Sequence, residues 1–503
     1  MIQGTASGVG KSLLTAALCR LFARVGYRVV PFKSQNMALN ASVTMDGGEI
    51  GRAQAVQAEA AGIEPTVDMN PILLKPESGD SSQVVVRGRS IGRMTFDEYR
   101  AMAPRLLDVA RDSLERLRRH RDLVIIEGAG SPAEINLAAD EIVNMRIARL
   151  ADAPVLLVGD VDRGGVFASL VGTLALLEAD DRARVRGLIV NKLRGDRALL
   201  GAGLDVLTAR TGLPVLGVVP YLPNVALAAE DALDLDTASH EPAGDCLTIA
   251  VVRLPRIANF DDLEPLAHEP GVRVRFVTTV SDFMMADCIV IPGSKSTAAD
   301  LAWLRSRGLD TVITAAARIG RPVLGICGGF QMLGARIDDP HHVESAADTV
   351  DGLGLLPVIT SFEPTKVTTR VRARVAAWTG MLGDAAGAEL DAYEIHAGRT
   401  EAIGPASHAF DIVRKGSRTA HERDGIIGEG GNVLGTYLHG LFGSGPVRRA
   451  LLTWLADRAG KPVHPQWGAA RAADMTYDDL ADAVGEALEL KTIAGLVGLS
   501  WPA

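Results

Sequence analysis

The sequence contains few cysteines and no hydrophobic run long enough to cross a membrane. Only 4 of its 503 residues are cysteine, and no two of them have the C-x-x-C spacing of a zinc site or redox pair. No apolar run reaches about 18 residues, and the N-terminus lacks a charged segment followed by an apolar one. These absences predict an untargeted, soluble protein of the reducing cytoplasm, without disulfides, zinc or a membrane anchor.

An excess of positive charge is also missing. The formal net charge is −9, from 52 Lys and Arg against 61 Asp and Glu, which argues against a nucleic-acid partner. The hydrophobic content of 47% is that of a globular chain, long enough for at least two domains with their own cores. His341 and His342 are adjacent and therefore point apart on regular structure, which favours a solvated loop over a metal site.

One cysteine, Cys327, stands where a short apolar strand runs into a helix. Gly325 and Gly329 flank it two residues away on each side. Such an elbow strains the backbone of its central residue, and glycine neighbours leave room for a substrate to approach. The helix also directs N–H groups and its positive dipole end at the thiol, which favours the thiolate. From this motif alone, a nucleophilic cysteine and a buried structural cysteine both remain possible.

A histidine follows a second short apolar strand further along the chain. Residues 433–438 have the composition of a buried strand, and His439 comes directly after them. A histidine in this place can act as the general base for a cysteine nucleophile. We therefore expect one sheet to deliver both Cys327 and His439.

The first residues of the chain have the pattern of a phosphate-binding loop, followed by an amphipathic helix predicted over residues 13–25. Backbone N–H groups of such a loop surround a phosphate, Lys11 reaches the outer phosphates, and the Ser12 hydroxyl can ligate magnesium. A chance glycine-rich turn is the alternative, which the strong helix disfavours. Only residues 1–3 precede the loop, so we expect the true start of the chain slightly upstream. The loop residues assigned to nucleotide binding are Gly4, Thr5, Gly8, Gly10, Lys11 and Ser12.

Further apolar segments of the N-terminal half end in polar residues, as the strands of a doubly wound sheet do at their ligand-binding edge. Glu127 stands at the tip of one such strand, where it is placed to act opposite Ser12 as a second magnesium ligand, either directly or through a water molecule. Asn191 and Lys192 follow another strand, where either side chain could instead close the turn. The predicted strands are residues 28–33, 122–126, 153–159, 185–190 and 213–219.

These blocks resemble known families. The phosphate loop has one residue more than the usual pattern, and in this it resembles the dethiobiotin-synthetase-like branch of P-loop proteins. The Cys327 and His439 blocks resemble class I (triad-type) glutamine amidotransferases, and residues 393–398 and 438–442 resemble their cobyrinate amidotransferase branch. From residue 4 to about 455 the chain is similar to the cobyric acid synthases of this family.

The resemblance implies an α/β protein with two doubly wound domains. The first is a P-loop NTPase-like parallel sheet, and the second is a class I glutamine amidotransferase (flavodoxin-like) domain. We expect an ATP-binding amide synthetase domain at residues 1–225, a linker at 226–245, the glutamine amidotransferase domain at 246–455 and a C-terminal helical extension at 456–503.

The resemblance also suggests roles for individual residues. It makes Asp46 a magnesium ligand, although an aspartate at this place could simply shape a turn. It places Asn191 at the adenine. The backbone N–H groups of Gly293 and Gly328 are candidates for an oxyanion hole. Typical class I enzymes carry a glutamate two residues after the histidine, where this chain has Leu441, so the third triad member stays unassigned.

The implied reaction is the ATP- and glutamine-dependent amidation of the b, d, e and g carboxylates of adenosylcobyrinic a,c-diamide to adenosylcobyric acid, in cobalamin biosynthesis. The implied cofactors are ATP and Mg²⁺, the partners are the corrinoid and L-glutamine, and neither nucleic acid nor a membrane is expected. The oligomeric state and the ammonia route stay open. Candidates for holding the substrate anions, on proximity to the loop in sequence, are Lys33, Arg52, Lys75 and Arg87.

Three other functions remain as alternatives. A cobyrinic acid a,c-diamide synthase would share both domains, but residues 35–37 and 259–262 favour the cobyric acid synthases. A P-loop switch ATPase would not need the pair Cys327 and His439. A cysteine hydrolase would leave an entire nucleotide-binding domain without a purpose.

Overall fold

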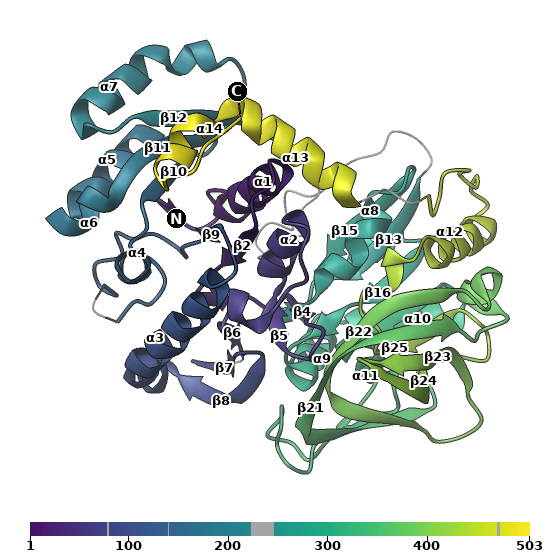
Figure 1. Cartoon of the computed structure of the whole chain (residues 1–503). Helices are drawn as coiled ribbons and strands as arrows, with labels where there is room; N and C mark the ends of the chain where they lie inside the picture. The colour runs from purple at the N-terminus through teal and green to yellow at the C-terminus, as the bar shows by residue number, and fades with distance from the viewer. Residues whose placement is uncertain (78–79, 139, 223–245, 470–472, 503) are drawn as a thin grey trace.

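The computed structural model describes residues 1–77, 80–138, 140–222, 246–469 and 473–502. Figure 1 shows two α/β halves side by side, the N-terminal one in purple to teal and the C-terminal one in green. The last helices, in yellow, lie over the N-terminal half. The expected linker at 226–245 lies outside the described residues.

The N-terminal half is built on a parallel sheet in the order β2-β9-β1-β10-β11-β12, in which an isolated bridge from Ile2 to Glu127 joins β1 to β9. Its strands are nearly continuous apolar runs because helices cover both faces of such a sheet. All six residues of β10 are buried. The strands are β1 (Ile2–Gly4), β2 (Val29–Phe32), β9 (Leu123–Ile126), β10 (Val155–Asp160), β11 (Val185–Leu193) and β12 (Val215–Pro220).

Seven helices are described in this half. The predicted helix at 13–25 forms as α1, which begins at Lys11, immediately after the glycine-rich loop. A capping box between Thr95 and Glu98 starts α3, because the two residues satisfy each other's backbone N–H groups. The helices are α1 (Lys11–Arg24), α2 (Arg52–Ala60), α3 (Phe96–Arg118), α4 (Met145–Ala151), α5 (Val166–Leu176), α6 (Ala179–Arg184) and α7 (Gly201–Thr211).

Two smaller strand groups follow β2 and extend toward the C-terminal half. One is a sheet in the order β3-β6-β7-β8, and the other is the hairpin β4/β5. The hairpin contacts the C-terminal half, where Lys366 Nζ lies 2.6 Å from Glu49 Oε2 and Arg370 Nε donates to the Val43 carbonyl at 2.7 Å. The strands are β3 (Gln35–Met37), β4 (Ala41–Val43), β5 (Glu49–Gly51), β6 (Ile72–Pro76), β7 (Ser81–Val86) and β8 (Arg89–Thr95).

The C-terminal half has a mixed sheet in the order β15-β13-β16-β18-β25-β24-β23-β21-β19-β20. The first five strands are parallel and carry the cysteine and histidine edge. These are β13 (Leu247–Val252), β15 (Val272–Val277), β16 (Cys288–Ile291), β18 (Val323–Ile326) and β25 (Val433–Thr436). The short pair β14 (Ile257–Ala258) and β17 (Gly293–Ser294) stands beside them, and the helices are α8 (Glu264–Ala267), α9 (Thr297–Ser306), α10 (Leu309–Arg318), α11 (Gly328–Leu333) and α12 (Gly445–Ala459).

Long antiparallel strands extend this sheet beyond the doubly wound part. In the sequence, residues 366–376 alternate between polar and apolar side chains, a pattern typical of a strand with one exposed face. These residues lie almost entirely in β21, which pairs along most of its length with β22. The alternation arises because one face of an antiparallel strand packs on the core while the other meets water. These strands are β19 (Arg336–Asp338), β20 (Thr349–Asp351), β21 (Val358–Val375), β22 (Glu389–Ala402), β23 (Ser407–Lys415) and β24 (Arg418–Ile427).

The C-terminal helices α13 (Ala473–Ala487) and α14 (Leu490–Gly495) pack on the N-terminal half (Figure 1). Leu480 and Val484 are fully buried in the same core cluster as Leu14 of α1. Arg20 Nε lies 2.8 Å from Asp478 Oδ1 along the same contact. The end of the chain therefore returns to cover the helix that follows the phosphate loop. Among the helices of the described residues, none is long and apolar enough to span a membrane.

Candidate active sites

Cys327 lies at the turn between β18 and α11 with a backbone φ of 52° and ψ of −109°. A non-glycine residue in this region is strained and persists only where its surroundings hold it there. Tight packing explains the neighbouring glycines. A Cβ on Gly329 would lie 1.9 Å from the Ile291 carbonyl oxygen, and one on Gly325 would lie 2.6 Å from a Leu333 methyl group. The elbow therefore presses against β16, and only glycine fits on either side of the cysteine.

His439 is placed beside Cys327 by the pairing of two neighbouring strands. β18 and β25 run parallel in register from Val323 to Ile326, and the Cys327 N–H donates to the Thr436 carbonyl at 2.8 Å. Both strands thus end at the same edge of the sheet. His439 is buried, with 2% of its surface exposed, and its ring stacks on Tyr393 at a centroid distance of 5.2 Å.

Asp262 supplies the carboxylate that the sequence left unassigned. Its Oδ2 lies 2.6 Å from His439 Nδ1, and its Oδ1 accepts the Gly440 N–H at 2.7 Å. Asp262 belongs to the 3-10 helix η4 (Phe260–Leu263), far from His439 in sequence. Leu441, at the position where class I enzymes carry glutamate, is instead buried in the core. The only sequence feature that pointed to this residue was the block at residues 259–262, which was noted for its resemblance to the cobyric acid synthases and not as part of a triad.

The surroundings of His439 favour its charged form. Burial alone lowers the pKa of this imidazole, but the Asp262 carboxylate and a hydrogen bond with the Cys327 side chain outweigh burial and raise the pKa to about 10. With Nδ1 held by Asp262, the other ring nitrogen faces the cysteine. Asp262 can therefore hold His439 as an imidazolium beside the Cys327 side chain, the arrangement that a cysteine nucleophile uses.

Cys327 and His439 open into a cavity of about 620 Å³, which we call the elbow cavity. Gly293 and Ser294 of β17 come close to the first turn of α11, since a Cβ on Gly328 would lie 2.9 Å from the Ser294 nitrogen. A Cβ on Gly293 would lie 3.4 Å from a ring carbon of His439. The structure thus brings Gly293 and Gly328 close to Cys327 and His439. Gly328 is the first residue of α11, where backbone N–H groups have no acceptor within the helix and can bind a substrate oxygen.

The phosphate loop connects β1 to α1 and contains two glycines in the left-handed region, Gly8 with φ 70° and Gly10 with φ 98°. Lys11 is 6% exposed, and its Nζ donates to the carbonyls of Ala6 at 2.9 Å and Gly130 at 3.1 Å. Thr5 continues the strand by donating its N–H to the Val158 carbonyl at 2.9 Å. The lysine thus bridges the loop to the chain that follows β9.

Asn191 supports the loop from the end of β11. Its Nδ2 donates to the Val9 carbonyl at 2.8 Å, and a Cβ on Gly10 would lie only 2.1 Å from that nitrogen. Gly4 also needs its small size, because a Cβ there would lie 2.4 Å from a Val9 methyl group. Asn191 therefore lies against the loop and, being 3% exposed, is a buried part of it.

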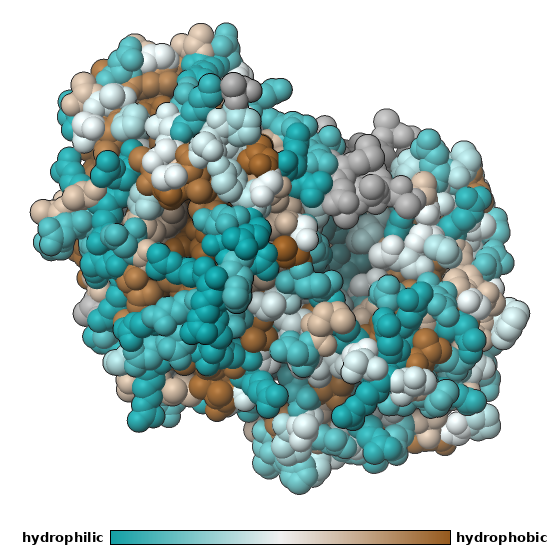
Figure 2. All heavy atoms as spheres, in the orientation of Figure 1, coloured by the Kyte–Doolittle hydropathy of each residue, from teal (hydrophilic) through white to brown (hydrophobic). Residues whose placement is uncertain are grey.

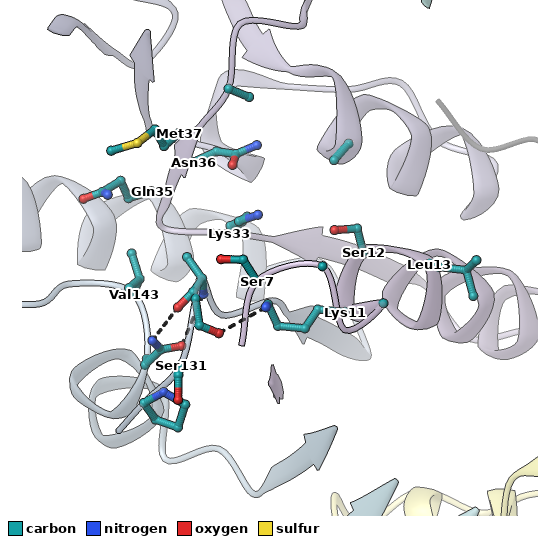
Figure 3. Close-up of a pocket in the computed structure, with 18 of the residues that line it drawn as sticks. Ser7, Lys11, Ser12, Leu13, Lys33, Gln35, Asn36, Met37, Ser131 and Val143 are labelled. Carbon is teal, nitrogen blue, oxygen red and sulfur yellow. Dashed lines mark hydrogen bonds between the residues drawn. The ribbon is translucent and has the colours of Figure 1, made fainter. Parts of the chain in front are cut away.

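A cavity of about 880 Å³, which we call the loop cavity, opens at this loop. Figure 3 shows Lys11 and Ser12 at the start of α1, with Lys33, Asn36 and Ser131 around the same space. On the outer surface, Figure 2 shows hydrophobic residues gathered in the middle of the N-terminal half, within a largely hydrophilic face. The lining of the loop cavity itself combines the Lys11 cation with apolar residues such as Val56 and Phe260, as a site for a phosphate-bearing ligand and an organic substrate requires.

Ser12 and Glu127 offer oxygen ligands suited to magnesium. Ser12 Oγ donates to Glu127 Oε1 at 2.9 Å, and Glu127 also accepts from Lys33 at 2.8 Å and Gln57 at 2.5 Å. Magnesium prefers oxygen ligands and is usually held by one or two carboxylates together with phosphate oxygens and water. Ser12 and Glu127 fit this preference, since they supply one hydroxyl and one carboxylate. Within the described residues, no group of three or more His, Cys, Asp or Glu side chains is placed to hold a metal ion.

Asp46 lies elsewhere. It is exposed in the turn of the hairpin β4/β5, where the Thr44 hydroxyl donates to it, and it lines the elbow cavity together with Cys327. Strands β4 and β5 pair with each other, and the turn between them packs against β21 of the C-terminal half. A Cβ on Gly47 in this turn would lie 3.1 Å from the Thr368 carbonyl oxygen. The structure therefore does not bring Asp46 together with Ser12 and Glu127.

The four cationic side chains proposed to hold substrate anions all have carboxylate partners inside the protein. Lys33 and Lys75 are buried, and Arg52 is not among the described residues that line either cavity. Lys33 lines the loop cavity, and Lys75 and Arg87 line the elbow cavity, so their role in holding substrate anions stays a prediction. The pairs are Lys33–Glu127 at 2.8 Å, Arg52–Asp261 at 3.0 Å, Lys75–Glu49 at 2.5 Å and Arg87–Asp112 at 3.3 Å.

One short segment separates the two cavities. Ile257 and Phe260 line the loop cavity, whereas Ala258 and Asn259 line the elbow cavity. Asn259 has φ 52° and ψ 41°, a left-handed conformation that asparagine tolerates better than most residues. The two sites therefore share a wall that is one segment thick.

Two protein families match the two halves of the chain. Residues 1–235 match the CobQ/CobB/MinD/ParA nucleotide binding domain, and residues 248–447 match the CobB/CobQ-like glutamine amidotransferase domain. A nucleotide-binding half joined to an amidotransferase half that carries a cysteine elbow defines a glutamine-dependent amidating ligase.

Relatives of known name are similar over the whole chain. The cobyric acid synthase of Sorangium cellulosum is 55% identical over 99% of this chain and 98% of its own length. Those of Dehalococcoides mccartyi strain 195 and Moorella thermoacetica are 52% and 48% identical, over 98% and 100% of this chain and 97% and 98% of their own lengths. The chain belongs to the cobyric acid synthase family.

Proposed function

We propose that this enzyme amidates the b, d, e and g carboxylates of adenosylcobyrinic a,c-diamide with ammonia from glutamine and energy from ATP, giving adenosylcobyric acid in cobalamin biosynthesis. The observation that carries the proposal is the shared wall at residues 257–260, which lines a phosphate-loop cavity on one side and a cysteine–histidine cavity on the other. Ammonia released in the elbow cavity would therefore have to pass only this one segment to reach the loop cavity.

In the elbow cavity, the Cys327 thiolate attacks the side-chain carbonyl carbon of glutamine. His439, charged and held by Asp262 at 2.6 Å, gives its proton to the departing nitrogen, so that ammonia leaves and a thioester remains. The backbone N–H groups of Gly293 and Gly328 stabilise the negative oxygen of the tetrahedral intermediate. Neutral His439 then takes a proton from water, whose attack on the thioester releases glutamate and restores the thiolate.

In the loop cavity, a substrate carboxylate oxygen attacks the γ-phosphorus of ATP, and ADP leaves. The resulting acyl phosphate is electrophilic, so ammonia attacks its carbonyl carbon and phosphate departs with the former carboxylate oxygen, leaving the amide. Lys11 neutralises charge on the outer phosphates, and Asn191 holds the loop and meets the adenine. Ser12 and Glu127 would hold Mg²⁺, which would offset the charge that builds on the phosphate oxygens.

The test is the mass of the corrinoid products made by purified protein with ATP, magnesium and glutamine. Fourfold amidation of the a,c-diamide, with no product when ATP is left out, is the expected result. Cobyrinic acid should be offered in parallel, because amidation only at the a and c positions would instead identify a cobyrinic acid a,c-diamide synthase. ATP hydrolysis without any amide product would favour a switch ATPase and contradict the proposal.

A further inference from the structure

Helix α2 touches both sites. Gln57 Nε2, on one side of this helix, donates to Glu127 Oε2 at 2.5 Å and approaches the Ser12 carbonyl at 3.5 Å. Arg52, the first residue of the same helix, lies with Nε 3.0 Å from Asp261 Oδ2. The backbone positions of residues 52 and 57 are about 7.5 Å apart along the helix axis. In Figure 1, α2 accordingly lies between α1 and the C-terminal half.

Asp261 is the direct neighbour of the triad residue Asp262 in η4. Burial raises the pKa of the Asp261 carboxyl, and the Arg52 guanidinium opposes this rise. Arg52 thus favours the charged form of Asp261 and lies beside it at 3.0 Å, whereas Asp262 is the carboxylate that faces His439 at 2.6 Å. A buried carboxylate without its cation would be costly, so η4 is expected to rearrange when Arg52 is lost.

Other contacts fasten the same segment to the N-terminal half. The Ala41 N–H donates to Asn259 Oδ1 at 3.2 Å, and the Phe260 N–H donates to Asn40 Oδ1 at 3.3 Å. The Arg52 N–H in turn donates to the Asn40 carbonyl at 3.2 Å. The start of α2 and the triad segment therefore move together.

We propose that Arg52 is a positioning residue through which the state of the phosphate loop controls the Asp262–His439 pair. Nucleotide and magnesium compete for the Ser12 hydroxyl and for the Glu127 carboxylate, to which both Ser12 Oγ and Gln57 of α2 donate. A ligand shifts an equilibrium only through contacts that differ between two states, and this exchange of partners is such a difference. The inference rests on the proposed function, because it assumes that ATP binds at the loop and glutamine at the elbow.

The test measures glutamate release by the full-length protein, with and without a non-hydrolysable ATP analogue and magnesium, and without corrinoid. In the wild-type protein the analogue should raise kcat about fivefold or more, a usual size for coupling between sites. KM for glutamine should change little, because Arg52 is outside the described lining of both cavities. Arg52→Met should lose this rise while keeping amidation from ammonium salts. Arg52→Lys should restore part of it, since lysine keeps the charge but not the planar guanidinium.

The matched control is Arg184→Met, which removes a 2.9 Å pair with Asp152 inside the N-terminal half. This variant should respond to the analogue like the wild-type protein. A full rise in Arg52→Met, or loss of amidation from both glutamine and ammonium, would overturn the proposal. Wild-type protein that amidates the corrinoid but shows no rise with the analogue would refute the coupling and leave the proposed function standing. Absence of corrinoid amidation would refute the proposed function itself.

Discussion

The two candidate sites differ in how their residues are distributed along the sequence. The phosphate loop is nearly contiguous, since residues 4–12 supply its glycines, Lys11 and Ser12. The elbow site combines Asp262, Cys327 and His439 from three separate segments. A loop that binds through backbone N–H groups needs a local conformation, whereas a triad needs three side chains at fixed distances, which only the sheet can provide.

The largest expected effect is the loss of glutamine-dependent amidation when the elbow site alone is disabled. Cys327→Ala should lower glutamine-dependent amidation by about 10⁶-fold, because loss of the nucleophile disables the whole unit. Amidation from ammonium salts should persist and grow as pH rises, since free ammonia is the minor species at neutral pH. His439→Ala should behave the same way. The measurement compares both nitrogen donors at one alkaline pH and constant ATP.

Cys288→Ala is the control for this variant. Cys288 is buried on the neighbouring strand β16, and burial raises the pKa of its thiol to about 12, so its removal should spare both reactions. Full glutamine-dependent activity in Cys327→Ala would show that the elbow is structural. A folded variant inactive with both donors would place the cysteine in the synthetase chemistry instead.

Asp262→Asn tests whether the third member is the residue that the geometry indicates. An asparagine keeps the shape but cannot stabilise the imidazolium, so glutamine hydrolysis should fall by about 10⁴-fold while ammonium-dependent amidation is kept. Asp262→Glu, which keeps the charge, should recover part of the rate. A loss smaller than about 10-fold, within the range of an ordinary hydrogen bond, would contradict the triad.

The same variant should change the pH dependence of stability. The pKa of His439 is raised from its ordinary value of 6.5 to about 10, so its charge stabilises the fold fully below pH 6.5 and progressively less as pH rises through 10. In Asp262→Asn this loss should begin at lower pH, because the carboxylate that raises the pKa is gone. Denaturant unfolding of both proteins from pH 6 to about 10.5 would measure the difference.

The sequence predicted those parts of the molecule that depend on local pattern. The loop, Glu127 at a strand tip and the elbow at Cys327 are each marked by apolar strands and glycines, and the structure has strands and turns at these places. Asp262 could not be found in this way, because its partner lies on a distant strand and the familiar position is filled by Leu441. The path of the hairpin β4/β5 toward β21 depends on contacts between the halves, which no local pattern encodes.

The packing of α13 on α1 is a second feature that the local sequence pattern does not predict. Leu480 and Val484 form an apolar face that any amphipathic helix presents, and nothing in their spacing says which surface they cover. The long β21 and β22 likewise appeared in the sequence only as alternation near residues 366–376, because alternation identifies a strand but not its partner.

Breaking the phosphate loop should affect both nitrogen donors. Lys11→Ala should lower amidation from glutamine and from ammonium alike by about 10³-fold or more, because charge on the transferred phosphoryl group is no longer neutralised. Slow hydrolysis of glutamine should continue, since Cys327, His439 and Asp262 are untouched. Product masses and glutamate release in the same samples would show both effects. Normal amidation by this variant would contradict the assignment of the loop.

The smallest expected effect concerns magnesium binding, and it compares Glu127, which contacts the phosphate loop, with Asp46, which is nearer to the loop in sequence but lies in the other cavity. Glu127→Gln should weaken magnesium binding by about 10- to 100-fold, the usual range for residues around a metal, so that added magnesium restores part of the activity. Asp46→Asn should show no such rescue, because Asp46 lines the elbow cavity, whereas Ser12 donates directly to Glu127 at 2.9 Å. Magnesium titrations of ammonium-dependent amidation by both variants decide the question. Rescue of Asp46→Asn by magnesium would mean that the hairpin β4/β5 swings to the phosphate loop when nucleotide binds, and the separation of the two sites described above would then hold only in the nucleotide-free protein.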